Sequence, residues 1–363
     1  MYNNRISTSA RYSLLVADIQ KSEANYNRLT TQLSSGKKIT NITDDPIGAV
    51  NIVNTNRQLG QIETFNQNVQ LAEQELSTLD DLMELAGGYL TRAWDKAVQA
   101  NNGTYGVSSL EALKVEIDEI TKTMVDLANT EFNGNFIFGG ANTKLTPYEI
   151  DENGNVLYYG TKHENPDYIR KTEVADGVFE VINTTGDYVF GYYDKYYYDS
   201  ATKTKYYPSI DEATGDTIYV DKEGNQYTGD VNDLTETEDS SGVMGALTIL
   251  SQSIQEVIDA KNAGDSDAEK IGYDRMFSTL DMFSNAHNDI VTEQTKFGGV
   301  YNRMEMTGAT LETNTENLTS YLSSIQDVDL ASAASEWIQA QYAYQASMQV
   351  AASTMGMSLL NYL

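Results

Sequence analysis

Apolar and small residues recur at alternating intervals of four and three positions near both ends of the chain. At the N-terminal end this stripe comprises Leu15, Ile19, Ser22, Tyr26, Leu29 and Leu33. At the C-terminal end it comprises Ala334, Ile338, Gln341, Gln345, Met348, Ala352, Met355, Leu359 and Tyr362. A repeat of about 3.5 residues keeps one face of a helix turned toward a partner helix. The pattern therefore predicts two terminal helices that pack on each other or on neighbouring copies.

Stop and start signals set the limits of these two helices. Gly36 suits the left-handed position that follows a helix, so the first helix is predicted over about residues 8–33. The sequence Asp327-Val328-Asp329 supplies an N-cap, and the C-terminal helix is expected to follow it.

Longer helices are predicted further inside the chain. An aspartate before Pro46 marks a helix start, and the same alternation then continues from Ile52 to Ala97 without a slip. A third helix is expected to begin near Ser108 and to end before Asn133, and helix returns after Gly242.

The last inner stripe predicts one continuous helix over about residues 270–326. Its positions are Tyr273, Met276, Leu280, Phe283, His287, Ile290, Gln294, Phe297, Tyr301, Met304, Gly308, Leu311, Thr315, Leu318, Leu322 and Ile325. Such a helix would be roughly 80 Å long at 1.5 Å per residue. That length suits a fibre better than a globular domain.

The helical period disappears between about residues 147 and 233. Strands are predicted at Val156–Tyr159, Val178–Asn183, Tyr188–Tyr193 and Ile218–Val220, with glycine-containing turns between them. This region is expected to form a small domain of β-hairpins.

The predicted fold is mainly α, with a small β domain inserted into a long antiparallel helical bundle or coiled coil. Its N- and C-terminal halves fold back on each other, which brings both termini to one end. Five segments follow: an N-terminal outer helix (1–42), the N-terminal half of the bundle (43–146), an acidic, tyrosine-rich β domain (147–240), the C-terminal half of the bundle (241–327) and a C-terminal outer helix (328–363) that pairs with the first.

Charge is distributed unevenly along the chain of 363 residues, whose net charge is −29. Residues 151–240 carry twenty acidic and seven basic residues, whereas Glu336 is the one acid in residues 330–363. The acidic balance argues against nucleic acid or an anionic membrane as a partner. We expect the middle segment to face solvent and the ends to be buried in an assembly.

Cysteine is absent, so disulfides and thiolate metal sites are excluded. The sequence has no run of 18 apolar residues that could cross a membrane. The N-terminus lacks the apolar core of a cleavable secretory signal, so we expect any export to use another route.

Candidate chemistry is sparse. We expect His287 to be a packed core residue and His163 to be solvated in a loop; neither belongs to an HExxH motif. Residues 151–155 superficially resemble a calcium loop, but the glycine is misplaced and a hairpin turn is favoured. The pairs Gly139-Gly140 and Gly298-Gly299 are expected to have turn or packing roles. No cofactor, metal or catalytic residue is predicted.

Several tyrosines of the β domain allow two interpretations. They could form a glycan-binding platform, but tyrosine also favours strands and half-buried sheet faces, which is the preferred interpretation. The residues are Tyr188, Tyr192, Tyr193, Tyr196, Tyr197, Tyr198, Tyr206 and Tyr207.

The stripes of the outer helices are thin and rich in alanine, so an isolated pair would be marginal in water. We therefore expect these helices to be largely disordered in the free subunit and to order when neighbouring copies cover them. The predicted assembly interface comprises Leu15, Ile19, Tyr26, Leu29, Leu33, Ile338, Met348, Met355, Leu359, Leu360 and Tyr362.

Several short segments resemble the bacterial flagellin superfamily. They are residues 5–8 (RIST), 32–39 (QLSSGKKI), 44–46 (DDP), 133–140 (NGNFIFGG) with the following Pro147-Tyr148, 185–190 (TGDYVF) and the C-terminal stretch 344–363. The DDP form, the Phe136–Gly140 stretch and the Asn361-Tyr362-Leu363 ending are more similar to the branch that joins hook to filament than to flagellin itself.

The resemblance implies a structural, non-enzymatic protein of the extracellular flagellum, exported unfolded through the flagellar type III apparatus. Its implied partners are a ring of further copies of itself, the first hook-associated protein, flagellin and an export chaperone that binds the C-terminal helix. Its termini would form an inner tube and its β domain the outer surface. Flagellin itself and a glycan-binding surface adhesin remain the alternatives, and an enzyme that uses a carboxylate pair of the β domain is disfavoured.

Overall fold

The computed structural model describes residues 8–151, 153–210, 217–221 and 225–360, with the side chains of 8–9, 208–210 and 355–360 excepted. The chain divides into two compact units. The terminal unit comprises Met1–Asn66 with Ala309–Leu363, and the central unit comprises Gln67–Gly308.

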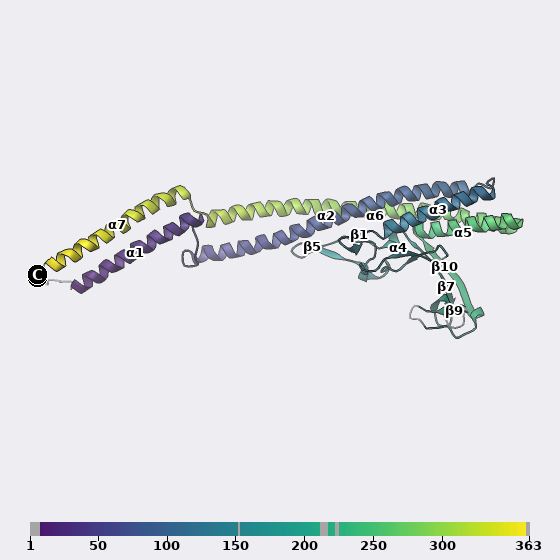
Figure 1. Cartoon of the computed structure of the whole chain (residues 1–363), viewed down its shortest axis with the longest axis horizontal. Coiled ribbons are helices and arrows are strands. Elements are labelled where there is room, and N and C mark those ends of the chain that lie inside the picture. The colour runs from purple at the N-terminus through teal and green to yellow at the C-terminus, as the bar shows by residue number, and fades with distance from the viewer. Residues whose placement is uncertain (1–7, 152, 211–216, 222–224, 361–363) are drawn as a thin grey trace. The chain divides into compact units, whose positions relative to one another are not determined.

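The terminal unit is built on a pair of antiparallel helices, α1 (Thr8–Ser35) and α7 (Leu330–Leu360), which lie side by side in Figure 1. Tyr26 meets Tyr344, and earlier along α7 Trp337 meets Thr30, so the two helices run in opposite directions. Both helices occur where the repeat predicted them.

The break after α1 lies beside the break before α7. Gly36 has a φ of +69°, as its predicted C-terminal position requires. Its carbonyl accepts a hydrogen bond from the Val328 amide at 3.0 Å, and the Lys38 amide donates to the Gln326 carbonyl at 2.6 Å. The segment that ends α1 and the segment that precedes α7 are far apart in sequence, yet their backbone amides and carbonyls hydrogen-bond to each other.

Aspartates cap the next helices as predicted. The Asp45 carboxylate accepts from the Ile47 and Gly48 amides at 3.1 and 3.0 Å at the start of α2 (Pro46–Ala100). Asp329 accepts from the Ala331 amide at 2.9 Å at the start of α7. In each case a carboxylate satisfies an amide that has no partner inside the helix.

The central unit contains the C-terminal part of α2 and most of α6 (Ser266–Gln326) as antiparallel neighbours (Figure 1). Asn101 reaches the Met276 carbonyl at 3.4 Å, and Gln294 donates to Asp80 at 2.9 Å. α6 is one continuous helix, as predicted. Along α2, the buried stripe follows the predicted positions from Val69 to Ala97.

Two shorter helices complete this bundle, α3 (Val107–Ala128) and α5 (Gly242–Ala263). They pack along each other, and Ser251 of α5 donates a hydrogen bond to Asp118 of α3 at 2.5 Å. α5 is apolar on most of its surface because it is covered by α3 on one side and by the β elements on the other.

The register of α6 differs from the predicted stripe at every second position. Met276, Phe283, Ile290, Phe297, Met304 and Leu311 are buried as predicted, but Thr279, Ala286, Glu293 and Val300 are buried in place of the residues that follow them. His287 is therefore exposed, and its prediction as a packed core residue was wrong. Between two shared positions of the heptad, the intermediate buried residue can follow the first after three residues or after four. The larger side chains of Leu280 and Tyr301 favoured the interval of four, which is incorrect.

The β region contains ten short strands. They are β1 (Glu131–Phe132), β2 (Asn135–Phe136), β3 (Tyr148–Ile150), β4 (Val156–Tyr158), β5 (Lys171–Ala175), β6 (Val178–Val181), β7 (Tyr192–Asp199), β8 (Thr204–Ile210), β9 (Thr217–Val220) and β10 (Leu234–Ser241) among the described residues. The first six form three hairpins, and the last four form an antiparallel sheet in the order β10-β7-β8-β9. Three single turns are helical: η1 (Pro166–Tyr168), α4 (Gly186–Val189) and η2 (Val231–Asp233).

The strands predicted to begin at Val156, Val178 and Ile218 are confirmed as β4, β6 and β9. The one predicted at Tyr188–Tyr193 was partly wrong, because the chain first forms α4 and becomes extended at Tyr192. The Phe190 amide donates to the Gly186 carbonyl at 2.8 Å in this turn. The turn buries Val189 and Phe190 together, which an extended chain would send to opposite faces.

Two glycines form the junction between the sheet and the helices. Gly191, just before β7, has a φ of +74°, and Gly242, just after β10, has a φ of +59°. A Cβ on Gly191 would lie 1.9 Å from the Ser241 carbonyl oxygen, and one on Gly242 would lie 2.6 Å from the Phe190 carbonyl oxygen. The chain therefore enters and leaves the sheet through one tight backbone contact.

Side chains fasten the hairpins to the bundle. The side-chain amide of Asn129, the C-cap of α3, donates to the Tyr148 carbonyl and accepts from the Tyr148 amide, each at 2.9 Å. Asn68 donates to the Glu173 carbonyl of β5 at 2.8 Å, and Arg170 forms an ion pair with Glu75 of α2. No helix in the described part of the chain is long and apolar enough to cross a membrane.

Candidate assembly surface

The inner face of the α1–α7 pair is aromatic near its middle. The rings of Tyr26 and Tyr344 are stacked with centroids 6.0 Å apart, and Trp337 lies 5.7 Å from Tyr26. The Trp337 indole nitrogen donates to the Thr30 hydroxyl at 2.8 Å. Leu29 is only 2 % exposed. The pair is therefore joined within a single chain by both apolar and polar contacts.

The predicted interface residues fall into three groups. On α1, Leu29 is buried and Leu15, Ile19, Tyr26 and Leu33 are half-buried, so they occupy the inner face. On α7, Ile338 and Met348 are 47 % and 49 % exposed. Met355, Leu359, Leu360 and Tyr362 lie outside the residues whose side chains are described.

The inner face of α7 is one position away from the predicted stripe. Ala333, Ala340 and Ala351 are buried, and Trp337, Tyr344 and Ser347 are half-buried between them. The intervals of four and three are the same in both stripes, so spacing alone cannot separate them. The large side chain of Trp337 indicated the correct stripe. The apolar side chains of Ile338 and Met348 favoured the neighbouring stripe, which was the one predicted.

This shift leaves an apolar outer face on α7. Ile338 and Tyr342 are four positions apart and lie on the side of the helix away from Trp337 and Ala340. The exposed apolar residues of α7 are Leu330, Ile338, Tyr342, Met348 and Val350. Glu336 is the one acid of residues 330–363, which contain no lysine or arginine. An apolar, almost uncharged surface of this kind is typical of a protein–protein contact.

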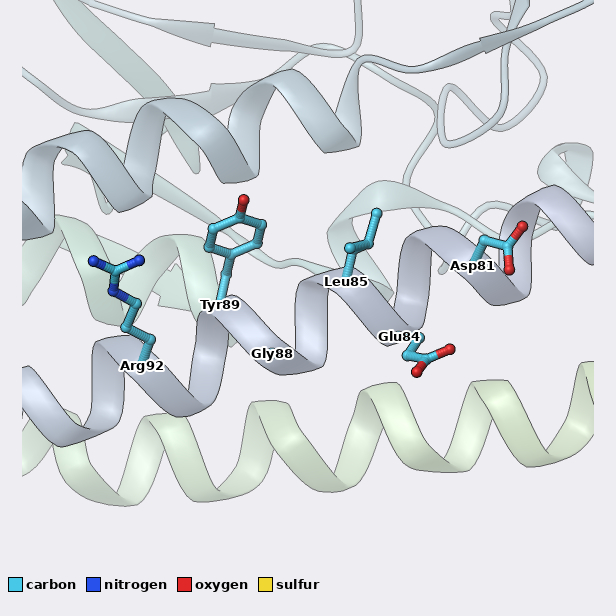
Figure 2. Close-up of a pocket in the computed structure, with 6 residues that line it drawn as sticks. All are labelled: Asp81, Glu84, Leu85, Gly88, Tyr89 and Arg92. Atoms are coloured by element: carbon cyan, nitrogen blue, oxygen red, sulfur yellow. The ribbon is translucent and has the colours of Figure 1, made fainter.

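A second surface feature is a hollow of about 640 Å³ on α2 (Figure 2). Its lining comprises Asp81, Glu84, Leu85, Gly88, Tyr89 and Arg92. In Figure 2 Leu85 and Tyr89 project to the same side of the helix, one turn apart. The hollow opens where Gly88 lacks a side chain, since a Cβ there would have no atom within 4 Å. It is an open surface without a nucleophile–base arrangement.

The other sequence candidates take structural roles. Between β3 and β4, Asp151 accepts from the Asn153 and Asn155 amides, each at 2.8 Å, and closes a turn. The hairpin prediction is thus confirmed. Among the described residues no group of histidine, aspartate and glutamate could hold a metal ion.

His163 is not the freely solvated side chain that was predicted. Its ring is stacked between Tyr168 and Tyr188, with centroids 4.6 and 4.4 Å away. Its backbone amide donates to the Asp187 carboxylate at 2.9 Å. It therefore fixes the loop before η1 against α4.

The glycine pairs differ from each other. Gly140 has a φ of +66° and occupies a turn, as predicted. Gly298 and Gly299 lie inside continuous α6, and a Cβ on either would have no neighbour within 4 Å, so neither a turn nor a packing role applies.

Comparison with known proteins gives matches at both ends of the chain. Residues 6–143 match the bacterial flagellin N-terminal helical region, and residues 280–363 match the bacterial flagellin C-terminal helical region. These regions contain α1, α2, α3 and α7 and most of α6.

Individual relatives extend the likeness over the whole length. Flagellar hook-associated protein 3 of Escherichia coli K12 is 25 % identical over 360 residues, which cover 98 % of each chain. Flagellar hook-associated protein 3 of Salmonella typhimurium LT2 is 31 % identical over 157 residues, covering 43 % of this chain and 49 % of the relative.

A solved structure shares the fold. The crystal structure of flagellar hook-associated protein 3 from Legionella pneumophila aligns with a TM-score of 0.55 at 16 % identity, covering 76 % of this chain and 98 % of the other. The chain belongs to the bacterial flagellin superfamily, and its full-length similarity within that superfamily is to hook-associated protein 3.

Proposed function

We propose that this chain is a structural subunit of the bacterial flagellum that joins the hook to the flagellin filament. The observation that carries the proposal is the outer face of α7, which keeps large exposed apolar side chains and almost no charge after α1 has covered the inner face. A subunit with such a face stabilises itself by packing against other helices of the same kind. The full-length similarity to hook-associated protein 3 identifies the flagellum as the setting.

In this proposal copies of the chain form a ring through their terminal helices. The first hook-associated protein binds on the hook side and flagellin on the filament side. The subunit has no enzymatic activity. It connects two different helical assemblies, the hook and the filament. The acidic β region, residues 147–240, faces outward.

Export precedes assembly. The subunit leaves the cell unfolded through the flagellar type III apparatus, without cleavage of a signal, and an export chaperone covers α7 until then. An outer face as apolar as that of α7 would otherwise promote premature association in the cytoplasm.

Microscopy of a strain that lacks this gene tests the proposal. Hooks should form, filaments should be missing, and monomeric flagellin should accumulate in the medium. The intact gene supplied in trans should restore filaments. Filaments of normal length on the deletion strain would overturn the proposal.

Flagellin itself is the second candidate, because both family models carry its name. The two differ in copy number. A junction subunit is a minor component of sheared filaments, whereas flagellin is the dominant protein. A dominant band of this chain would favour the filament subunit.

A further inference from the structure

A cleft of about 580 Å³ lies between the β3–β4 hairpin and strands β7 and β8 of the four-stranded sheet, in the central unit. Tyrosine rings form most of its wall. Tyr158 and Tyr159 come from β4 and its end, Tyr192 from β7 and Tyr207 from β8. Tyr159 is 52 % exposed, so its ring presents an open face to a ligand.

These rings differ from the other tyrosines of the sheet. Tyr197 packs edge-on against Tyr219 at 4.6 Å, and Tyr206 packs against Tyr227 at 5.0 Å. Such pairs fulfil the ordinary role of tyrosine on a half-buried sheet face. At the cleft, Tyr158 packs against Tyr148 at 4.9 Å, whereas Tyr159 lies at the opening with 52 % of its surface exposed.

Polar groups of both kinds reach the cleft. The Asp194 carboxylate, with 14 % of its side chain exposed, accepts from the Tyr207 hydroxyl at 3.2 Å. The Lys162 ammonium lies 4.0 Å from the centre of the Tyr192 ring. The site therefore offers a hydrogen-bond acceptor, a donor and aromatic faces within one hollow.

The charges around the cleft balance locally. The Lys205 ammonium lies 3.9 Å from Asp194 and 3.7 Å from Asp239, and Asp239 accepts from the Tyr192 hydroxyl at 3.0 Å. The lining itself contributes one ammonium group, Lys162, and one carboxylate, Asp194. Burial raises the pKa of Tyr192 and of Tyr207 above the usual range, so both hydroxyls stay protonated and can donate.

This balance selects the class of ligand. An anion would meet Asp194, and a cation would meet Lys162, so neither has a net electrostatic gain. A neutral polyhydroxylated ring uses donors and acceptors together, and its apolar C–H face can lie on an aromatic ring. We propose that this cleft binds a neutral saccharide, whose sugar ring stacks on Tyr159 and whose hydroxyls bond to Asp194 and Lys162.

The test uses the purified full chain on a glycan array. The array carries neutral hexose and N-acetylhexosamine oligosaccharides beside sialylated and amine-bearing ones. We expect saturable binding to neutral glycans. Saturation-transfer NMR with the bound oligosaccharide measures the affinity of each variant.

Two variants and one control locate the site. Tyr159→Ala removes the exposed ring, Asp194→Asn removes the charged acceptor, and each should weaken binding at least tenfold. Tyr206→Ala, outside the cleft, should leave the affinity within twofold. Equal thermal midpoints and unchanged assembly of Tyr159→Ala show that the fold persists.

The proposal is overturned if no neutral glycan binds saturably, if charged glycans alone bind, or if Tyr206→Ala reduces binding as much as Tyr159→Ala. Because the deletion experiment reports on filament formation and this one on ligand binding, either idea can fail while the other stands.

Discussion

The indole nitrogen of Trp337 donates a hydrogen bond to the hydroxyl of Thr30 across 307 positions of the sequence. This bond ties the N-terminal part of α7 to the C-terminal part of α1. The same hydroxyl donates to the Tyr26 carbonyl at 2.8 Å one turn earlier in its own helix. Thr30 is therefore both donor and acceptor at the interface.

The first prediction concerns this bond. Trp337→Phe keeps an aromatic ring near Tyr26 but removes the donor, which costs about 0.5–1.5 kcal/mol. Amide exchange in α1 and α7 of the assembled protein should become about two- to tenfold faster. Thr30→Val should have a similar effect, and the double variant should add little more.

Amide exchange also tests whether the outer helices order only in the polymer. Amides of residues 8–35 and 330–360 should exchange rapidly in a dilute subunit and slowly after assembly. Full protection of both stretches in the dilute subunit would contradict this hypothesis.

A second prediction separates the two faces of the outer pair. Leu29→Asp places a charge on the buried inner face, where the loss of a leucine costs about 2–5 kcal/mol and the desolvated carboxylate adds to it. The α1–α7 pair should then fail to form on assembly while the central unit stays folded. Circular dichroism of the free subunit should be unchanged, and no filaments should form.

Ile338→Asp changes the outer face instead, where the side chain is 47 % exposed. It should leave the inner contacts between α1 and α7 unaltered yet prevent assembly, while Ile338→Val should assemble normally. Normal swimming of the Ile338→Asp strain would show that the outer face is not a subunit contact.

A third prediction concerns the tip of the sheet. Lys195 and Glu238 are opposite each other in the β7–β10 register, so an Asn-Gly turn can join them when residues 196–237 are removed. The bridge from Arg275 to Glu238, at 2.8 Å, is retained. Motility and filament formation should persist, because none of the deleted residues belongs to a terminal helix. Loss of filaments with a folded subunit would assign the tip a role in assembly.

A fourth prediction uses two glycines inside helices. A Cβ on Gly88 has open space around it, so Gly88→Ala should stabilise the central unit by about 0.5–1 kcal/mol. A Cβ on Gly272 would lie 2.6 Å from a methyl carbon of Val257, so Gly272→Ala should destabilise it. Urea unfolding should show opposite shifts of the midpoint. Equal shifts would contradict the packing of α6 on α5.

The fifth prediction is a pH dependence in the link between α1 and α2. The Asp44 carboxylate accepts from the Asn41 and Thr40 amides at 2.9 and 3.1 Å, and these bonds lower its pKa below the ordinary 3.8. A lowered pKa means that the stabilisation is present above pH 4 and is lost as the pH falls through the folded value. The amide resonance of Asn41 should therefore titrate below pH 3.8. Asp44→Asn should abolish that titration; a midpoint at or above 3.8 would contradict the hydrogen-bonded geometry.

The helices could be predicted from the sequence because long repeats and caps agree with each other. Asp45, Asp329 and Gly36 are in the positions that their local chemistry indicates. Lateral register could not be predicted to better than one residue. Thr279 and Leu280 satisfy the same period, and only the partner helix decides which of them is buried.

The same ambiguity affected the candidate surface. The α1 stripe was predicted at the observed positions, because leucine and isoleucine dominate it. On α7 the covered residues are mostly alanine, so the more apolar Ile338 and Met348 were assigned to a stripe that faces outward. Those residues remain candidates for contact between subunits, but not within one chain.

The β region could be predicted less well. β10 has the sequence LTETEDSS, whose alternation is weak, and it pairs with β7 across a long separation in sequence. The tyrosine cleft likewise depends on β4 meeting β7 and β8, and no spacing in the sequence predicts that encounter.

The contact between Gly191 and Gly242 has a consequence for how this protein can change. β7 and β10 leave the bundle side by side through one narrow neck, and side chains such as Arg275 and Gln252 hold the base of the sheet. Replacements, extensions or losses beyond the neck transmit little strain to α5. In the proposed subunit, the tip of the sheet can therefore change in length and sequence while the helices proposed to assemble stay the same.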